Sequence, residues 1–210
     1  MTKPDSLIFD MDGTLWDATE TYTAAWNEGF KAMNINKVIS RGMLDHMMGW
    51  EKQKVLDHAF PDYPADMQEK IFESIVAAQD RLIPALGGIL YEGVTEGITK
   101  LSSKYKIFIL SNCPKDTINQ FIAFTDFAPH ITDQIAHGVN GMPKHHNIKL
   151  LAAKHNLQNP LYVGDTDSDR AQSELAGVPF VFVEYGFGQT ENYALNFSSF
   201  TELTNYFLEL

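Results

Sequence analysis

The sequence predicts an α/β fold, in which a parallel sheet carries helices on both faces and a helical domain is inserted after the first strand. From residue 87 onward, short apolar runs alternate with segments of helical period, which is typical of a parallel sheet. Residues 17–86 show helical patterns throughout and directly follow the first apolar run. We therefore expect a core assembled from residues 1–16 and 87–210, and a helical domain of residues 17–86.

The first strand and the helical block can be followed along the chain. Residues 7–9 are a short apolar run that suits a buried strand, and Asp17 with Glu20 matches a helix capping box. The helix that follows carries an apolar face of Tyr22, Trp26, Phe30 and Met33. We expect two short helices over 41–50 and 51–60, then a longer helix over 64–86 whose apolar face holds Met67, Ile71, Ile75 and Ala78. Gly87 and Gly88 end this pattern.

The rest of the chain alternates between helix and strand. Helices are expected over 94–105, 115–127, 147–157 and 169–177, and strands over 106–112, 134–138, 160–165 and 179–186. A last helix is indicated by a capping box of Ser199 and Glu202, with an apolar face of Phe200, Leu203, Phe207 and Leu210. The four strands after residue 87 extend the sheet that the first strand begins.

Composition and charge narrow the class of protein. The chain has 210 residues, of which 44% are hydrophobic and 20% charged, as in ordinary globular proteins. No apolar run reaches the roughly 18 residues of a membrane span, and the first residues lack the apolar core of a secretory signal. Cys113 is the single cysteine, which excludes an internal disulfide and makes the cytoplasm the expected compartment. A net charge of −11 without a basic run disfavours nucleic acid. We expect no membrane partner, and the oligomeric state stays open, with a monomer compatible.

Polar residues gather where the expected strands end. The first strand is followed by Asp10, Asp12, Gly13 and Thr14, the second ends in Ser111 and Asn112, the fourth is followed by Asp165, Asp167 and Asp169, and the loop between the third and fourth holds Lys144. Open α/β sheets bind ligands outside the carboxyl ends of their strands. These clusters are therefore expected on one rim of the sheet.

Each cluster also has a purely structural interpretation. Asp10 and Asp12 are compatible with a solvated turn, although two carboxylates on one side of a strand would repel unless a cation or a proton lay between them. Lys144 alone is compatible with a surface lysine. The segment 165–176 is not a calcium-binding EF-hand loop, because Arg170 and Ala176 stand where that loop requires Gly and Glu. It is either a solvated helix start or a metal site.

Taken together, these motifs resemble the haloacid dehalogenase superfamily, specifically its helical-capped branch related to phosphoglycolate phosphatase and β-phosphoglucomutase. Residues 10–14 are similar to the family's first motif, DxDGT, and residues 163–169 resemble its fourth motif, GDxxxD. Ser111 and Asn112 resemble the second motif and Lys144 the third. In the family that lysine is often followed by Pro-x-Pro, whereas here Pro143 precedes it, so Lys115 and Lys149 stay open as alternatives.

The resemblance implies a Rossmann-like core with a helical cap domain, residues 17–86, and a Mg²⁺-dependent phosphatase that acts on a small phosphorylated metabolite through an aspartyl phosphate. It implies that Asp10 is the nucleophile and that Asp12 is the general acid and base. It places Mg²⁺ on the Asp10 carboxylate, the Asp12 backbone carbonyl and Asp165. The phosphate would be held by Lys144, Ser111, Asn112 and N–H groups near Gly13, with Thr14 and Asp169 orienting the site.

Specificity is expected from the inserted block, since a helical insertion after the catalytic strand emerges at the same rim. Arg41, Trp50 and Lys52 are the candidate substrate contacts, and His145 and His146 stay open as further ones. We expect the block to move as a lid, with hinges near residues 15–17 and 87–88. Cys113 has no evident base partner and is expected to be structural.

Two other functions remain in competition with the phosphatase. A phosphomutase of the β-phosphoglucomutase type would use the same rim and would hand the phosphoryl group to a sugar hydroxyl, with Lys52 near the place of a basic cap residue. A non-catalytic binding protein is compatible with the fold alone. A dehalogenase is disfavoured, because that chemistry has no use for Asp12 as an acid or for a metal.

Overall fold

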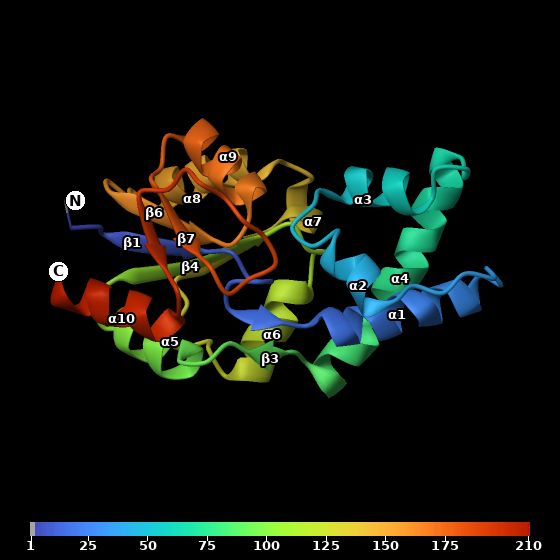
Figure 1. The fold of residues 1–210 in the computed structure, drawn as a ribbon, viewed down its shortest axis with the longest axis horizontal. Helices are drawn as coiled ribbons and strands as arrows, with labels where there is room; N and C mark the ends of the chain where they lie inside the picture. The colour runs from blue at the N-terminus through green and yellow to red at the C-terminus, as the bar shows by residue number, and fades with distance from the viewer. Residues whose placement is uncertain (1–2) are drawn as a thin grey trace.

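The core of the protein is one parallel sheet with helices on both faces (Figure 1). The structure is a computed structural model that describes residues 3–210. Within this range the strand order is β5-β4-β1-β6-β7-β8, and every neighbouring pair is parallel. The strands are β1 Ser6–Phe9, β4 Lys106–Ser111, β5 Asp133–Ala136, β6 Pro160–Gly164, β7 Phe180–Val183 and β8 Leu195–Phe197. The predicted fold class is confirmed.

The sheet is buried from both sides because its strands are apolar on both faces. Leu7 and Phe9 of β1 belong to a core cluster that contains Phe200, whose ring centroid lies 5.7 Å from that of Phe9. Ile8, between them, belongs to a second cluster with Ile148 on the opposite face. This alternation is the period of two that a strand imposes.

Six helices accompany the sheet in the described chain. α5 Val94–Ser102 and α10 Phe200–Glu209 lie on one face, and α8 Lys144–His155 and α9 Asp167–Ala176 lie on the other (Figure 1). α6 Thr117–Thr125 follows β4, and the short α7 His137–Asn140 follows β5. Between residues 3 and 210, no helix combines the length and the apolar character that a membrane crossing needs.

Four helices fill the chain between the first strand and Gly87. They are α1 Thr19–Ala32, α2 Arg41–Asp45, α3 Lys52–Ala59 and α4 Ala65–Leu86, and they lie to one side of the sheet (Figure 1). Their interior is largely aromatic. The Phe60 ring stacks on Trp26 at a centroid distance of 6.0 Å and meets Phe30 edge-on at 5.7 Å. These helices form the helical cap of the fold.

The two chain crossings between core and cap run side by side. β2 Trp16–Asp17 pairs antiparallel with β3 Ile89–Leu90, a two-stranded ribbon that the sequence pattern did not predict. The two crossings are therefore joined to each other as well as to the core and the cap.

Several predicted elements need correction. The predicted helix over 147–157 begins at Lys144, directly after Pro143, so Lys144 lies in a helix rather than in a loop. β8 and α7 were not predicted, since each is too short to show a period. Leu210 was assigned to the apolar face of the last helix but lies beyond its end and is 38% exposed.

The capping predictions are only partly confirmed. The Asp17–Glu20 box is wrong: α1 has Ala18 at its N-cap, and the Asp17 carboxylate instead accepts a bond from the Thr19 N–H at 2.9 Å. The reason is that Asp17 belongs to the ribbon. At α10, the Ser199 hydroxyl accepts from the Glu202 N–H at 3.2 Å as predicted, whereas the Glu202 carboxylate binds Ser198.

Candidate active site

Three strands bring the motif residues to one rim. Asp10 directly follows β1, Ser111 is the last residue of β4, and Asp165 directly follows β6, and these strands are neighbours in the sheet. The Asp10 backbone N–H donates to the Val163 carbonyl at 2.8 Å, which continues the pairing of β1 with β6 as far as the site. The sheet topology therefore brings the polar clusters together on one rim, as predicted.

A buried ion cluster occupies this rim. The Lys144 ammonium lies 2.9 Å from Asp10 Oδ2 and 2.6 Å from Asp169 Oδ1, and all three side chains are at most 2% exposed. Burial raises the pKa of Asp10 well above its usual range, and the charge of Lys144 opposes that rise. The pKa of Lys144 is itself raised, because the two carboxylates outweigh the effect of burial. Lys115 and Lys149, the alternatives, are both exposed.

Asp165 completes a group of three carboxylates. One oxygen each of Asp10, Asp165 and Asp169 lies within 4.8 Å of the others. Burial, together with the negative charge of Asp169, raises the pKa of Asp165 to about 7. One ammonium cannot neutralise three buried carboxylates, so the raised pKa values of Asp10 and Asp165 reflect, besides burial, the excess negative charge that the cluster would carry with all three ionised. A cation would relieve it.

The residues at this cluster fit a divalent metal. Asp10 Oδ1 is buried with no hydrogen-bond partner among the described residues, and such an orphaned carboxylate oxygen is a ready ligand. The donors are all oxygens, which suits a hard cation such as Mg²⁺. Gly13 lies against Asp165: a Cβ built on Gly13 would lie 2.2 Å from Asp165 Oδ2. Only glycine leaves room for the carboxylate there.

Two residues orient Asp165. The Thr14 hydroxyl donates to Asp165 Oδ1 at 3.2 Å, and the Phe187 backbone N–H donates to Oδ2 at 2.8 Å. Asp169 is held in turn by the Thr166 hydroxyl at 2.6 Å, within the capping box of α9. Thr14 and Asp169, for which the resemblance implied orienting roles, thus contact Asp165 and Lys144, respectively. Phe187 acts through its backbone, which no sequence pattern could have indicated.

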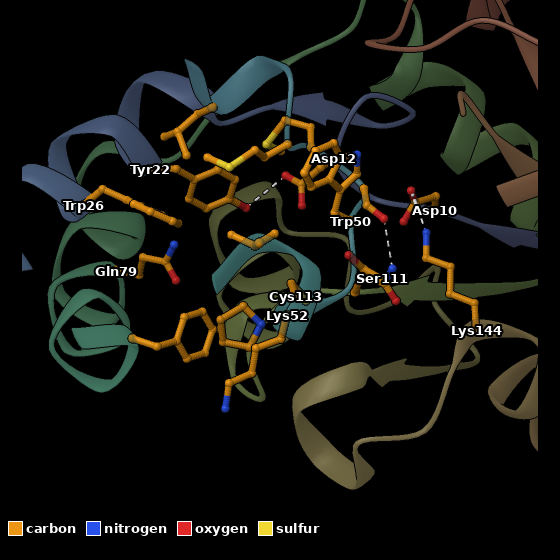
Figure 2. Close-up of a pocket in the computed structure, with 18 residues that line it drawn as sticks. Asp10, Asp12, Tyr22, Trp26, Trp50, Lys52, Gln79, Ser111, Cys113 and Lys144 are labelled. Carbon is orange, nitrogen blue, oxygen red and sulfur yellow. Dashed lines mark hydrogen bonds and ion pairs between the residues drawn. The ribbon is translucent and has the colours of Figure 1, made fainter. Parts of the chain in front are cut away.

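Asp12 lies apart from the ion cluster. Its Oδ1 accepts bonds from the Trp16 indole N–H and the Tyr22 hydroxyl, each at 2.9 Å (Figure 2). Burial raises the pKa of Asp12 to about 6, although these two hydrogen bonds favour the ionised form. β1 ends at Phe9, so Asp12 is not the second carboxylate of a strand face. The two acids of the motif therefore have different surroundings.

The backbone at Gly13 has another task than the one expected. Gly13 adopts a φ of +81°, and its N–H donates to the Trp16 carbonyl at 2.9 Å within the turn. That N–H is therefore used inside the turn and is not free to hold a phosphoryl oxygen. The contribution of Gly13 is its lack of a side chain beside Asp165.

A cavity of about 110 Å³ opens from Asp10 and Asp12 toward the cap. Its lining includes Ser111, Asn112 and Lys144 from the core and Trp50 and Lys52 from the cap (Figure 2). The Asn112 amide donates to the Gly49 carbonyl at 3.0 Å, which ties the α2–α3 loop to the rim. The structure thus brings two of the three predicted cap residues to the site.

The other predicted contacts lie elsewhere. Arg41 does not line the cavity: its guanidinium pairs with Asp17, Glu20 and Asp45. His145 bonds Gln172 at 2.8 Å, and neither it nor His146 lines the cavity. Sequence reasoning missed several lining residues, among them Tyr22, Trp26, Phe72 and Gln79. The sequence analysis assigned Tyr22 and Trp26 to the apolar face of a helix. Helical period identifies such a face, but it does not reveal whether part of that face borders a cavity.

Cys113 also lines the cavity and is buried. Burial raises the pKa of its thiol to about 12, and the negative charge of Asp12 acts in the same direction. The thiol is therefore protonated at neutral pH and is a poor nucleophile. This supports the structural role expected for Cys113.

Comparison with known proteins gives one consistent result. A model of the haloacid dehalogenase-like hydrolase family matches residues 7–183. The phosphoglycolate phosphatase of Rhodobacter capsulatus is 24% identical over 195 residues, which is 88% of this chain and 86% of the relative. A second phosphoglycolate phosphatase, from Rhodospirillum rubrum, is 24% identical over 200 residues, or 89% of this chain and 82% of the relative.

Solved structures show the same fold. A haloacid dehalogenase-like hydrolase from Bacteroides fragilis superposes with a TM-score of 0.84 at 20% identity, over 96% of this chain and 100% of that one. CbbY from Rhodobacter sphaeroides, solved in complex with xylulose-(1,5)bisphosphate, superposes with a TM-score of 0.78 at 15% identity, over 95% and 96% of the two chains. At these identities the likeness concerns the fold of the backbone.

Proposed function

The chain belongs to the haloacid dehalogenase-like hydrolase family, and from that premise we propose that it is a Mg²⁺-dependent phosphatase of a small phosphorylated metabolite. The observation that carries the proposal is the contrast between Asp10 and Asp12. Asp10 lies beside Lys144 in the ion cluster, whereas burial raises the pKa of Asp12 to about 6, close to neutral pH. Two carboxylates in different surroundings suit two different chemical roles.

In the first step the Asp10 carboxylate attacks phosphorus and the bond to the leaving alkoxide breaks. The protonated form of Asp12 gives its proton to that alkoxide, so that an alcohol departs and an aspartyl phosphate remains on Asp10. In the second step the ionised Asp12 takes a proton from water as the water attacks phosphorus. Inorganic phosphate leaves, and the Asp10 carboxylate is restored.

The remaining residues bind and orient. Lys144, Ser111 and Asn112 line the cavity next to Asp10 and are proposed to hold the phosphoryl oxygens. Asp10, Asp165 and the Asp12 backbone carbonyl are proposed to hold Mg²⁺. When bound, the metal neutralises the cluster and the charge of the phosphoryl group.

We also propose the division of the chain into a core of residues 1–16 and 87–210 and a cap of residues 17–86. Its support is the β2–β3 ribbon, which lies at both boundaries. In this proposal the cap closes over the site for the first step and opens for the second, and the only described lysine it contributes to the cavity is Lys52. No contact of Lys52 specifically favours the phosphomutase alternative.

The test is phosphate release from an aryl phosphate with Mg²⁺ present. We expect turnover to disappear in excess chelator and in Asp10→Asn, because both remove what the first step needs. Asp62→Asn is the matched control, since it makes the same chemical change at an exposed position of the cap. Full activity in chelator, or an acid-stable, base-labile phosphoenzyme in Asp10→Asn, would show that the assignment is wrong.

A further inference from the structure

The cavity has apolar walls on the side away from the ion cluster. The cap contributes the apolar side chains of Trp26, Met47, Trp50, Val55 and Phe72 to its lining. Figure 2 shows Trp26 and Gln79 on the opposite side of the cavity from Asp10 and Lys144. A substrate whose phosphate lies at Asp10 therefore places its leaving group among aromatic and aliphatic side chains.

Neither cation of the lining is free for a second anionic group. Among the described residues that line the cavity, Lys144 and Lys52 are the cationic ones. Lys144 is paired with Asp10 and Asp169. The Lys52 ammonium lies 2.6 Å from Glu69 Oε1 and 4.8 Å from the centre of the Phe72 ring. Figure 2 shows it pointing away from Asp10.

One uncharged polar group faces this apolar region. Gln79 of α4 is 7% exposed, and its Oε1 is buried with no hydrogen-bond partner among the described residues. A buried polar atom without a partner is costly, and a ligand that supplies the missing bond is favoured. The amide suits a hydroxyl or another uncharged donor.

Resting on the proposed function, we propose that the substrate's leaving group is small, uncharged and mainly apolar, with one hydrogen-bond donor that reaches Gln79. The cavity of about 110 Å³ is of the same order as the roughly 150 Å³ cavity that takes up benzene, so the leaving group is no larger than one small ring. A substrate with a second anionic group, such as phosphoglycolate or a sugar bisphosphate, would bury an unpaired charge against the apolar wall. The cap of this chain therefore selects against substrates that carry a second anionic group.

Three matched substrates test the proposal. Butyl phosphate, 3-hydroxypropyl phosphate and 4-(phosphonooxy)butanoate have chains of similar length that end in a methyl, a hydroxyl and a carboxylate. With the wild-type enzyme and Mg²⁺, we expect kcat/KM to be at least ~10-fold lower for the carboxylate than for the other two. Gln79→Leu should lower kcat/KM for the hydroxyl substrate relative to kcat/KM for the methyl substrate.

A variant that breaks the Lys52–Glu69 ion pair tests whether this pairing is what keeps Lys52 from binding a second anionic group. Glu69→Gln frees the Lys52 ammonium and should raise kcat/KM for the carboxylate substrate by roughly threefold or more relative to the methyl substrate. Glu73→Gln makes the same change one helical turn later, at an exposed residue that forms no ion pair in the described chain. Glu73→Gln should leave the ratio of kcat/KM for the carboxylate substrate to kcat/KM for the methyl substrate unchanged.

The outcomes distinguish this inference from the function on which it rests. If an aryl phosphate is not hydrolysed at all, the phosphatase proposal fails, and the inference fails with it. If the aryl phosphate is hydrolysed and the carboxylate substrate is equal or preferred, the phosphatase stands and the inference is overturned. A Gln79→Leu variant that affects the hydroxyl and methyl substrates equally would remove the role of Gln79.

Discussion

Replacing Gly13 with alanine tests how the site depends on one atom. The new Cβ would lie 2.2 Å from Asp165 Oδ2 and 2.7 Å from Phe187 Cδ2, whereas such contacts are essentially never below 3.0 Å. The Asp165 carboxylate must therefore move by about 1 Å, away from the bond that it accepts from the Phe187 N–H. A misplacement of ~1 Å in a catalytic group costs about 10²-fold in rate.

Backbone strain has to be separated from this displacement. Gly13 has a φ of +81°, and alanine in that region costs roughly 1–2 kcal/mol. Gly177 has a φ of +75° with no atom within 4 Å of a built Cβ. Gly177→Ala therefore carries similar strain without the clash, and it should lower Tm by about 2–8 °C, at ~2–4 °C per kcal/mol for a chain of this size.

The assay combines kinetics with thermal unfolding. For Gly13→Ala we expect kcat/KM on an aryl phosphate to fall by about 10²-fold, whereas Gly177→Ala keeps the wild-type value. Mg²⁺ at 100 times its Kd should stabilise the wild type and Gly177→Ala by about 2.7 kcal/mol. Gly13→Ala should lose most of that stabilisation. If the two variants agree within about threefold in kcat/KM and gain equally from Mg²⁺, the contact between Gly13 and Asp165 does not govern the site.

Three further outcomes follow from individual side chains. Lys144→Met leaves buried carboxylates unpaired and should lower the free energy of unfolding by about 3–5 kcal/mol in chelator. Adding Mg²⁺ should restore part of this stability. An equal loss of stability with and without Mg²⁺ would contradict the argument that the cluster needs a cation. Arg41→Met should leave kcat/KM of all substrates unchanged, because Arg41 lies outside the cavity, and should cost at most ~1 kcal/mol of stability. Burial raises the pKa of Asp133, but hydrogen bonds from Lys154 and His155 outweigh it, so that the pKa falls below its ordinary 3.8. The stability that Asp133 adds is present above pH 3.8 and is lost as the pH falls through the lowered value, so urea unfolding should show a wild-type advantage over Asp133→Asn at pH 7 that shrinks at pH 3.

The strands and the motif acids could be predicted from local patterns. Residues 7–9 and 106–111 are apolar without interruption because they are buried on both faces, and a run of this kind is visible without any partner. Asp10, Ser111 and Asp165 could be placed on one rim because parallel strands end on the same side. These inferences need only the chain order and the period of the side chains.

Short elements escaped prediction for a related reason. β8 has three residues and the β2–β3 ribbon two on each side, so their pairing depends on the neighbouring strand rather than on a period of their own. α8 begins at Lys144, directly after Pro143, three residues before the predicted start, and the two carboxylates that Lys144 contacts come from distant parts of the chain, which no local pattern shows.

The sequence by itself determined the fold class, the family and the acids of the rim. The tertiary structure decided which side chains meet. Arg41 and Lys52 were equivalent cationic candidates along the chain, yet Arg41 pairs with Asp17 across 24 residues, and Lys52 pairs with Glu69 across 17 residues while it lines the cavity. Gln79 showed no signal in the sequence and became a cavity residue because α4 packs along α1. Such partners depend on how distant helices pack, and helical period reports only which face of a helix is buried, not what lies against it.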